Sequence, residues 1–558
     1  MNAVKPMFFP TPYQEAADAG RMILRDGSAA VVRRAGPGDA KAVRAFYGRL
    51  SAQSRWMRFF SEAKPQEEAV RGICDDSRPE ELVTLLVLRG EGQVIATGSW
   101  IRMEEGRAEF AVAVDDGFHG KGIGGILLER LAILAVARGC TTFVAVTHPS
   151  NRAMLDVFRH SGFEMTERME EGLVHIELNV RPRAESVAHA DLRDRVFTKA
   201  SVRPFFDPKG IAVVGASRDT GSVGHRVLEG LVRGGFSGSI FPVNPQARVV
   251  FSIKAYPRVT DIPDAVDLAI LCVPREAVRG VVEDCAVKGV RALVVVSSGY
   301  AEAGAKGAER QRELRDQVRD LGMRMLGPNA LGVINTDPEV RLHGTFAPVA
   351  PLPGKIALSS QSGALGLALL NVAKGCGLGL SMFASMGNKA DLTGNDLLYF
   401  WEDDERVEVI LLYLESFGNP RRFARIAREV GRRKPIVCVK SGRARERTRV
   451  SRRLEDATVS GLFQQIGVVR ADTLEEMFEV AGLLGNQPLP RGARVALVTN
   501  SRGAGILCAD ACDTENLEAL EGGRFAAGGG GGAGGGGGAG AAGGGAGAGG
   551  EGGGGGAC

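Results

Sequence analysis

The sequence predicts a multidomain α/β protein, and three observations support this prediction. Apolar runs of strand length alternate with amphipathic helical stretches along most of the chain. Glycine-rich turns join several of these strands to the helix that follows, as in HGKGIGG and VVGAS. The chain has 558 residues, which is enough for about three or four domains of ordinary size.

Changes in composition predict where the domains begin and end. A polar, charge-rich stretch without a sustained apolar face, which contains RPRAES and DLRDR, follows the first α/β unit and is interpreted as a linker. The last segment is almost pure Gly and Ala and cannot bury enough apolar surface to offset its ordering entropy, so we expect it to be disordered. A frameshift or truncation would account for it. The predicted divisions are 28–180 for the first unit, 181–203 for the linker, 204–335 for the second unit, 350–486 for the third, 490–521 for an incomplete further αβ unit and 522–558 for the tail.

Composition narrows the class of protein. With 44% hydrophobic residues, 24% charged residues and a net charge of +4, the chain favours no strongly charged partner. The N-terminus has no basic region followed by an apolar run, and no stretch of eighteen apolar residues occurs, so we expect a cytoplasmic protein that does not enter membranes. The nine cysteines occur singly, without a CxxC pair or a Cys/His cluster, so we expect neither a disulfide framework nor a metal site.

The first unit contains a candidate phosphate-binding loop. In AEFAVAVDDGFHGKGIGGILLERL a strand runs into a glycine loop that opens a helix, so unobstructed N–H groups and the positive helix end would face a pyrophosphate. Such a loop alone is a weak signal, because glycines also make ordinary turns. The strand before it, the long helix after it and the later FVAVTHPSNRAMLDVFRHSGF make the set more specific. The candidate ligand-binding residues are His119, Gly120, Lys121, Gly122, Ile123 and Gly124.

In this order the segments resemble the GNAT family of N-acetyltransferases over residues 28–178. The family motif is Gln/Arg-x-x-Gly-x-Gly/Ala, and His119 stands here at its first position. The resemblance implies a GNAT fold and acetyl-CoA as co-substrate. His119 as a catalytic base is an alternative, but a loop residue that contacts phosphate or solvent is favoured. LSAQSRWMRFF and AEFAV resemble the branch that acetylates protein lysines.

Transfer to a lysine requires a base, since an ammonium with a pKa of about 10.4 is no nucleophile. Glu109 is the candidate, because the lysine-acetylating branch places its glutamate in the same AE-x-A context; the alternative is a solvated carboxylate on the outer strand face. Backbone N–H groups from Val112 to Val114 would stabilise the oxyanion. Phe158 stands near the position where many GNATs have a tyrosine acid, so the general acid is unassigned. Asn151 is expected to contact CoA, to cap its helix, or both.

The second unit begins with GIAVVGASRDTGSVGHRV, which superficially matches a dinucleotide-binding turn. It lacks G-x-G-x-x-G, and Asn244 stands where NAD-binding proteins have an acidic residue, so NAD is disfavoured. VVGAS, FPVNP, LCVP, VSSGYAE and GPNALGVIN instead resemble the Rossmann-like CoA-binding domain of NDP-forming, succinyl-CoA synthetase-like acyl-CoA ligases. SSQSGALG, GNKADLTGND, LLYLES and KPIVCVKSGR resemble the flavodoxin-like ligase domain that follows. The resemblance implies a second site for CoA or acyl-CoA at Gly215, Ala216, Ser217, Asn244, Pro274, Ser298 and Gly299.

Ligases of this family work through a phosphohistidine, which the resemblance places shortly after SGR. This chain has its last histidine at 343, so the segment after SGR contains none. We also expect the ATP-grasp domain to be absent, because the chain becomes almost pure Gly and Ala where further structure would begin. We therefore expect no ligase turnover, although Glu415 stands where the ligases have a glutamate that contacts the phosphohistidine; a local hydrogen bond at the strand end is the preferred role for it.

The arrangement resembles bacterial protein acetyltransferases that acetylate acyl-CoA synthetases. We expect an acetyl-CoA-dependent lysine acetyltransferase whose ligase-like region senses CoA or acyl-CoA. The alternatives are a ligase subunit that needs a separate ATP-grasp partner, and a non-catalytic CoA-sensing module. The basic run from Arg421 to Arg453 lacks interleaved aromatics and has the apolar spacing of a packed helix, so nucleic-acid binding is disfavoured.

Overall fold

The computed structural model describes residues 17–90, 92–104, 106–441, 449–488 and 491–519. The chain divides into a large unit up to Pro488 and a second unit from Leu489. The Gly/Ala tail at 522–558 lies outside the described residues. Within the described ranges, no helix is long and apolar enough to cross a membrane.

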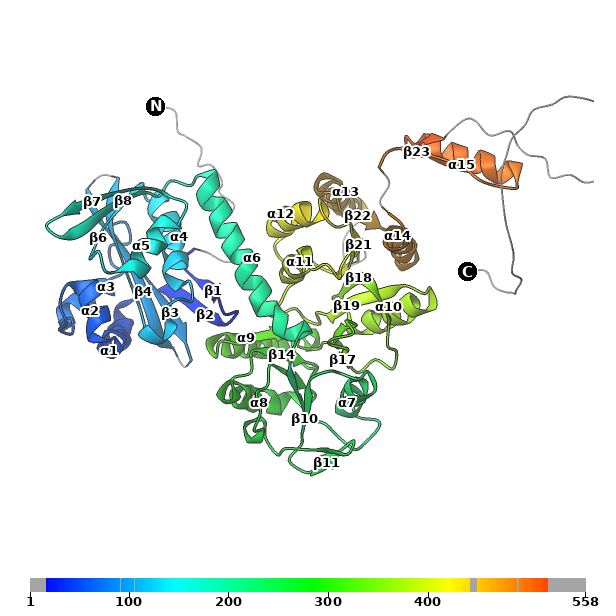
Figure 1. Ribbon diagram of the computed structural model, residues 1–558, viewed down its shortest axis with the longest axis horizontal. Coiled ribbons are helices and arrows are strands. Elements are labelled where there is room, and N and C mark those ends of the chain that lie inside the picture. The colour runs from blue at the N-terminus through cyan, green and yellow to red at the C-terminus, as the bar shows by residue number, and fades with distance from the viewer. Residues whose placement is uncertain (1–16, 91, 105, 442–448, 489–490, 520–558) are drawn as a thin grey trace, which may run out of the picture. The chain divides into compact units, whose positions relative to one another are not determined.

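The first domain is built on one eight-stranded sheet with the order β1-β2-β3-β4-β5-β6-β8-β7 (Figure 1). Helix α4 packs with one face of the sheet into a core around Trp100, while α1 packs into a separate core on the other face. The predicted strands are present, and so are the two helices predicted after Gly124 and Asn151; the first of them begins slightly earlier than predicted, at Ile123. The elements are β1 (Gly20–Ile23), β2 (Ala29–Arg34), α1 (Ala40–Arg49), α2 (Ala52–Phe59), α3 (Glu67–Ile73), β3 (Leu82–Arg89), β4 (Gln93–Glu104), β5 (Arg107–Val114), α4 (Ile123–Val136), β6 (Thr142–Thr147), α5 (Arg152–Arg159), β7 (Glu164–Glu170) and β8 (Leu173–Asn179).

The second domain is a five-stranded parallel sheet with the order β10-β9-β13-β14-β15. All five strands end at the same edge, where parallel α/β sheets bind ligands. The alternation of strand and helix predicted for this region is confirmed. The elements are β9 (Gly210–Val214), α7 (Val223–Arg233), β10 (Ser239–Val243), β11 (Val249–Val250), β12 (Ile253–Lys254), β13 (Leu268–Leu271), α8 (Arg275–Lys288), β14 (Ala292–Val295), α9 (Ala305–Asp320) and β15 (Arg324–Leu326).

The third domain is a seven-stranded mixed sheet with the order β17-β16-β19-β18-β20-β21-β22. Its strands β20 and β21 are almost continuous runs of buried apolar residues, VILLYL and IVCV, as expected for strands covered on both faces. The elements are β16 (Gly332–Asn335), β17 (Leu342–Thr345), β18 (Leu352–Ser360), α10 (Gly363–Gly375), β19 (Gly379–Ser385), α11 (Gly394–Glu402), β20 (Val409–Leu414), α12 (Pro420–Gly431), β21 (Ile436–Lys440), α13 (Arg449–Ile466), β22 (Val469–Ala471) and α14 (Leu474–Asn486).

The smaller unit that starts at Leu489, taken by itself, contains β23 (Arg494–Val495), α15 (Arg502–Thr514) and β24 (Glu518–Ala519). The two short strands pair in parallel across the helix. This is a single strand, helix and strand.

The segment interpreted as a linker, 181–203, lies mostly within a 23-residue helix, α6 (Ala184–Phe206). This helix contributes to two hydrophobic cores. Phe197 packs into the core of the first domain, whereas Val202, Phe205 and Phe206 pack into a core formed with the second and third domains. Ion pairs hold its polar side, so the helix needs no continuous apolar stripe, which explains why the sequence pattern did not reveal it.

These ion pairs connect α6 to α4 on one side and to α11, α12 and the residue after α11 on the other. Arg193 pairs with Glu129 of α4. Asp194 lies 3.1 Å from Arg422 in α12, and Arg195 lies 2.8 Å from Glu402 in α11. Further pairs are Asp191 with Arg425, Arg195 with Glu429, and Lys199 with both Asp403 and Glu402.

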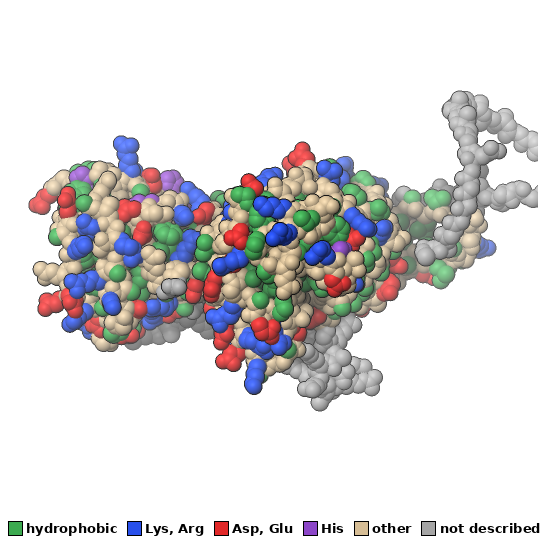
Figure 2. All heavy atoms as spheres, turned by 90° about the horizontal axis from the view of Figure 1, so that it is seen from below, with side chains coloured by type: hydrophobic (Ala, Val, Ile, Leu, Met, Phe, Trp, Pro, Cys, Tyr) green, Lys and Arg blue, Asp and Glu red, His purple; other side chains and the backbone are tan. Residues whose placement is uncertain are grey.

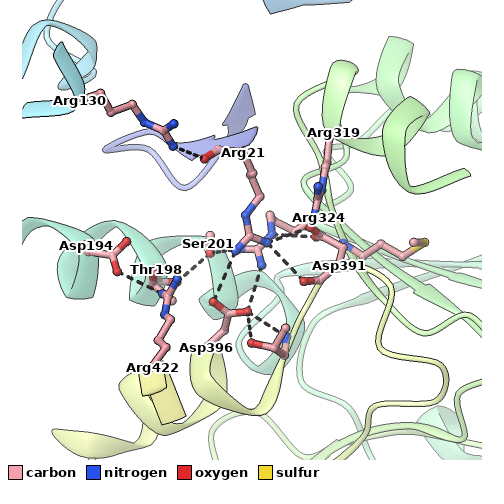
Figure 3. A network of polar contacts seen from close by, with 12 residues as sticks. Arg21, Arg130, Asp194, Thr198, Ser201, Arg319, Arg324, Asp391, Asp396 and Arg422 are labelled. Atoms are coloured by element: carbon pink, nitrogen blue, oxygen red, sulfur yellow. Dashed lines mark hydrogen bonds and ion pairs between the residues drawn. The ribbon is translucent and has the colours of Figure 1, made fainter. Parts of the chain in front are cut away.

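A buried charge cluster lies at the inner side of α6 (Figure 3). Asp391 accepts hydrogen bonds of 2.8 Å from both Arg21 of β1 and Arg324 of β15, and Arg319 lies 3.2 Å from it. Asp396 lies 3.7 Å from Arg21 and caps α11 by accepting the N–H of Thr393 at 2.8 Å. Burial alone would raise the pKa of Asp391, but the neighbouring arginines hold it far below its usual range. We call Arg21, Arg319, Arg324, Asp391 and Asp396 the charge cluster.

Replacement of Asp391 with Asn should destabilise the protein by about 3–5 kcal/mol, because it removes the carboxylate that lies closest to three arginines of a buried cluster. Urea denaturation of the full chain measures this. Asp403→Asn is the matched control: its carboxylate is more than half exposed, so the loss should be at most about 1 kcal/mol. Equal losses in the two variants would contradict the role of the cluster.

The same cluster predicts how stability depends on pH. Asp391 and Asp396 have folded pKa values below the unfolded value of about 3.9, so their contribution is complete above that pH and is lost as the pH falls. In Asp391→Asn the free energy of unfolding should fall less steeply below about pH 4 than in the wild type. Parallel curves would contradict this.

Candidate functional site

Strands β5 and β6 of the first domain separate and open a V-shaped gap in the sheet. They pair in parallel only at Arg107, Ala108 and Glu109, whose partners are Thr142 to Val144. Beyond that point β5 remains paired with β4 up to Val114, and β6 remains paired with β8 up to Thr147. The facing backbone edges of 110–114 and 145–147 therefore do not pair with each other, and a ligand can hydrogen-bond to them.

The glycine loop lies directly after this strand. Gly120 and Gly122 have positive φ angles of 74° and 83°, and Gly122 is the N-cap residue directly before α4. A Cβ atom at Gly120 or Gly125 would meet no atom within 4 Å, so the loop is open on its outer side. Open N–H groups at a helix N-terminus are suited to a pyrophosphate.

Glu109 lies at the apex of the V. Its neighbours Ala108 and Phe110 are buried in the core that contains α4, so the Glu109 side chain points to the opposite face, where it is exposed. Among the described residues it has no ion-pair or hydrogen-bond partner. Its register partner on β4, Ile101, is also exposed, at 44%. The carboxylate is thus accessible to an incoming amine, and the geometry is equally that of a solvated side chain.

The structure places the remaining candidates of the first site around the gap. Val112 and Val114 lie on β5 where pairing with β6 has ended. The ring of His119 bonds to the carbonyl of Val114 at 3.0 Å, so this side chain folds back onto the strand, which fits a loop residue better than a base. Lys121 is held 3.0 Å from Asp26. Ile123 is buried below the loop, and a Cβ atom at Gly124 would make ordinary contact with Val157.

Asn151 caps α5. Its side-chain oxygen accepts the N–H of Met154 at 3.3 Å, and its amide donates to Thr147 at the end of β6 at 3.0 Å. It is therefore tied to the strand that forms one wall of the gap. Phe158 is fully buried and packs against Phe110, so it belongs to the core. The general acid stays unassigned.

The residues predicted for the second site gather at the carboxyl edge of the five-stranded sheet. Gly215 follows β9 with a φ of 89°, and the carbonyl of Ala216 accepts a hydrogen bond of 2.6 Å from Asn244, which follows β10. Ser217 accepts the N–H of Asp219 and so shapes the turn before α7. Asn244 thus closes the loop, a role that an acidic residue could not fill with this geometry.

The other three second-site residues follow the neighbouring strands. Pro274 follows β13 and is the N-cap residue directly before α8. Ser298 and Gly299 follow β14; Gly299 has a φ of 96°, and a Cβ there would lie 2.6 Å from Arg275. These seven residues share one sheet edge, which is where a CoA pyrophosphate would be expected.

Glu415, which stands where the ligases have a glutamate that contacts the phosphohistidine, lies at the carboxyl edge of the third sheet. The side-chain oxygen of Gln361 accepts the N–H groups of Glu415 and Ser416 at 2.9 and 3.0 Å. Lys389 donates to Ser416 at 2.8 Å, and Lys440 donates to the carbonyl of Glu415 at 2.9 Å. Burial lowers the pKa of both lysines. The two lysines were not singled out from the sequence, although GNKADLTGND and KPIVCVKSGR contain them; the segment 442–448, where a phosphohistidine would follow, lies outside the described residues.

Several arginines of the basic run that begins at Arg421 form ion pairs within the protein. Arg422 and Arg425 pair with α6, and Arg433 lies 2.8 Å from Asp403. Figure 2 shows positive and negative side chains interspersed on the face it presents, without a large area of one sign. Side chains at 442–457 lie outside the described residues. For the C-terminal part of the run, the absence of nucleic-acid binding therefore stays a prediction.

Three family descriptions match the chain in this order. Residues 50–163 match the Acetyltransferase (GNAT) family, residues 209–336 match the CoA binding domain, and residues 353–484 match the succinyl-CoA ligase like flavodoxin domain. The first two imply binding of acetyl-CoA and CoA.

Relatives extend these matches. The alpha subunit of an ADP-forming acetate–CoA ligase from Pyrococcus furiosus is 40% identical over 331 residues, which cover 58% of this chain and 71% of that protein. An acetyltransferase from Pseudomonas aeruginosa is 28% identical over 144 residues, which cover 25% of this chain and 77% of that protein. A solved acetyl-coenzyme A synthetase from Ca. Korarchaeum cryptofilum, in complex with phosphate and ADP, is 38% identical with a TM-score of 0.53 and covers 57% of this chain and 69% of that one. The chain spans less than half the length of several longer ligases that it also matches.

Gly224→Ala should abolish CoA binding at the second loop. A Cβ atom there would lie 2.0 Å from the carbonyl oxygen of Gly215, so the loop at 215–217 must move. Calorimetric titration of the full chain with CoA should show one binding equivalent fewer than the wild type. Gly280→Ala, in α8 with open space around it, is the control and should bind as the wild type does. An unchanged stoichiometry in Gly224→Ala would place CoA elsewhere.

Proposed function

The chain belongs to the family of NDP-forming acetate–CoA ligase alpha subunits and carries a GNAT domain before the family region, and on this premise we propose that it acetylates lysines of other proteins. The observation that carries the proposal is the juxtaposition of three features in the first domain. An exposed carboxylate at Glu109 lies at the apex of the gap between β5 and β6, and the open glycine loop lies at the end of the same strand. The substrate class is the finer part of the proposal, and AEFAV with LSAQSRWMRFF supports it by resemblance.

In the proposed reaction Glu109 takes a proton from the lysine ammonium, directly or through one water molecule. The neutral amine attacks the thioester carbon, so a C–N bond forms and the C–S bond breaks. N–H groups between Val112 and Val114 stabilise the negative charge on the carbonyl oxygen. The attacking nitrogen gives its second proton to water, and water protonates the leaving thiolate, since no side chain of the chain is assigned to either step.

We further propose that the ligase-like region senses CoA or acyl-CoA. Seven candidate residues at one sheet edge support a second site, and the missing histidine argues against turnover there. Binding at that edge can change the transfer rate only if the ligand prefers one of two arrangements of the chain. The transfer rate of Gly224→Ala at increasing CoA, compared with that of the wild type, measures this coupling.

Acyl-CoA synthetases are the proposed acceptors, because acetylation removes the positive charge of a lysine and would silence a lysine that their reaction needs. The proposed location is the cytoplasm, where acetyl-CoA and such acceptors meet. Labelled acetyl-CoA incubated with the purified chain and a cell lysate, followed by mass spectrometry, identifies the acceptors.

Glu109→Gln should lower acetyl transfer by about 10²–10⁴-fold, the range expected for loss of a general base. Binding of acetyl-CoA should persist, because the side chain lies outside the glycine loop. Glu177→Gln is the matched control. Glu177 is also exposed, and it pairs with Val144 of β6 from the side opposite to Glu109, so both carboxylates lie on the same face of the sheet. This variant should retain activity within a few-fold. Full activity in Glu109→Gln would remove this residue from the mechanism, and an inactive wild type would favour a non-catalytic sensor.

The second candidate function is a ligase subunit that works with a separate ATP-grasp protein, as favoured by the 40% identity to an alpha subunit. We expect no phosphoprotein when the full chain is incubated with labelled ATP and the ATP-grasp subunit of such a ligase, because no histidine follows residue 343. The Pyrococcus furiosus alpha subunit serves as the positive control. Phosphorylation of the chain in this experiment would establish that it functions as a ligase subunit.

A further inference from the structure

The glycine loop of the first domain rests on segments outside the region that matches the GNAT family. One of them is the turn between β1 and β2. Its Arg25 N–H donates to the carbonyl of Lys121 at 3.0 Å, and its Asp26 carboxylate lies 3.0 Å from the Lys121 ammonium. The turn therefore fixes both the backbone and the side chain in the middle of the loop.

The second supporting segment is α6. A Cβ atom at Gly122 would lie 2.7 Å from the ring of Phe197, so this ring occupies the space directly behind the loop. Phe197 is only 5% exposed and shares its core with Ile123, the first residue of α4. The ring thus supports the point where the loop becomes a helix.

Both segments are in turn held by the ligase-like part of the chain. Gly27, in the β1–β2 turn, has a φ of 82°, and a Cβ there would lie 2.7 Å from the backbone of Ala200 and Ser201 in α6. Ser201 accepts a hydrogen bond of 2.5 Å from Arg324 in the charge cluster, and β1 contributes Arg21 to the same cluster (Figure 3). Loop, turn, helix and cluster form one continuous set of contacts.

We propose that Phe197, together with the β1–β2 turn, positions the glycine loop for acetyl-CoA, so that the affinity of the first domain depends on how α6 is docked. This inference rests on the proposed function. Phe197 is a positioning residue, since it touches the loop from behind and has no access to the reacting atoms. A loop that is already held in its binding conformation loses less conformational entropy when the pyrophosphate binds. Loosening the loop therefore weakens binding, while the chemical step at Glu109 is unaffected.

Phe197→Ala should raise the KM for acetyl-CoA about tenfold and leave kcat within about twofold. Phe197→Leu, which refills most of the space, should restore much of the affinity and also serves if the alanine variant does not fold. Val196→Ala is the matched control on the next residue of the same helix, half exposed and outside both cores; it should behave as the wild type. A fall in kcat at unchanged KM in the Phe197 variants would overturn the proposal.

Hydrogen exchange of the backbone amides at 119–125 in the full chain, followed at increasing acetyl-CoA concentration, tests the positioning role of Phe197 separately from the proposed acetyltransferase function. Protection in the wild type at lower acetyl-CoA than in Phe197→Ala supports the positioning role. Identical protection curves in both proteins overturn it and leave the proposed function intact. Absence of protection in the wild type overturns the proposed function itself and the positioning role with it.

Discussion

The helix α6 is the constraint on which the rest of the large unit depends. One helix supplies an aromatic residue to the core of the first domain and three apolar residues to the core shared by the second and third domains. Separating the domains would expose these side chains and strip counter-charges from buried arginines. Each exposed aromatic side chain costs about 1.5–3 kcal/mol and each uncompensated buried charge costs more. The arrangement is therefore that of one folded body, although three family descriptions divide it.

The charge cluster adds directionality to this apolar junction. Asp391 gathers arginines from three elements, and the guanidinium forks restrict how these elements can be oriented. Apolar contacts tolerate sliding, whereas hydrogen bonds of 2.8 Å to both carboxylate oxygens do not. Buried ion pairs contribute little net stability, and here their main effect is to define one docking of β1, β15 and the segment before α11.

The sequence was informative wherever structure is determined locally. Glycines with positive φ at 120, 122 and 215 mark the two proposed ligand loops, and alternation of apolar residues marks the strands around them. The helix α6 was not recognisable as a packed element, because its partners are distant: Asp194 and Arg422 are 228 residues apart, and Arg21 and Asp391 are 370 apart. No periodicity within a short window contains that information. Phe197 was missed for the same reason, since nothing near it in the sequence points to Gly122.

The double membership of α6 also bears on how such a chain can be inherited. The GNAT match covers residues 50–163, but the loop within it rests on a turn before residue 28 and on a ring at residue 197. A first domain that is exchanged between proteins must bring along β1 and most of α6, or find a substitute for both in its new host. The structural module is thus longer than the region that matches the GNAT family, and its two ends pack as much against the ligase-like neighbour as against the first domain.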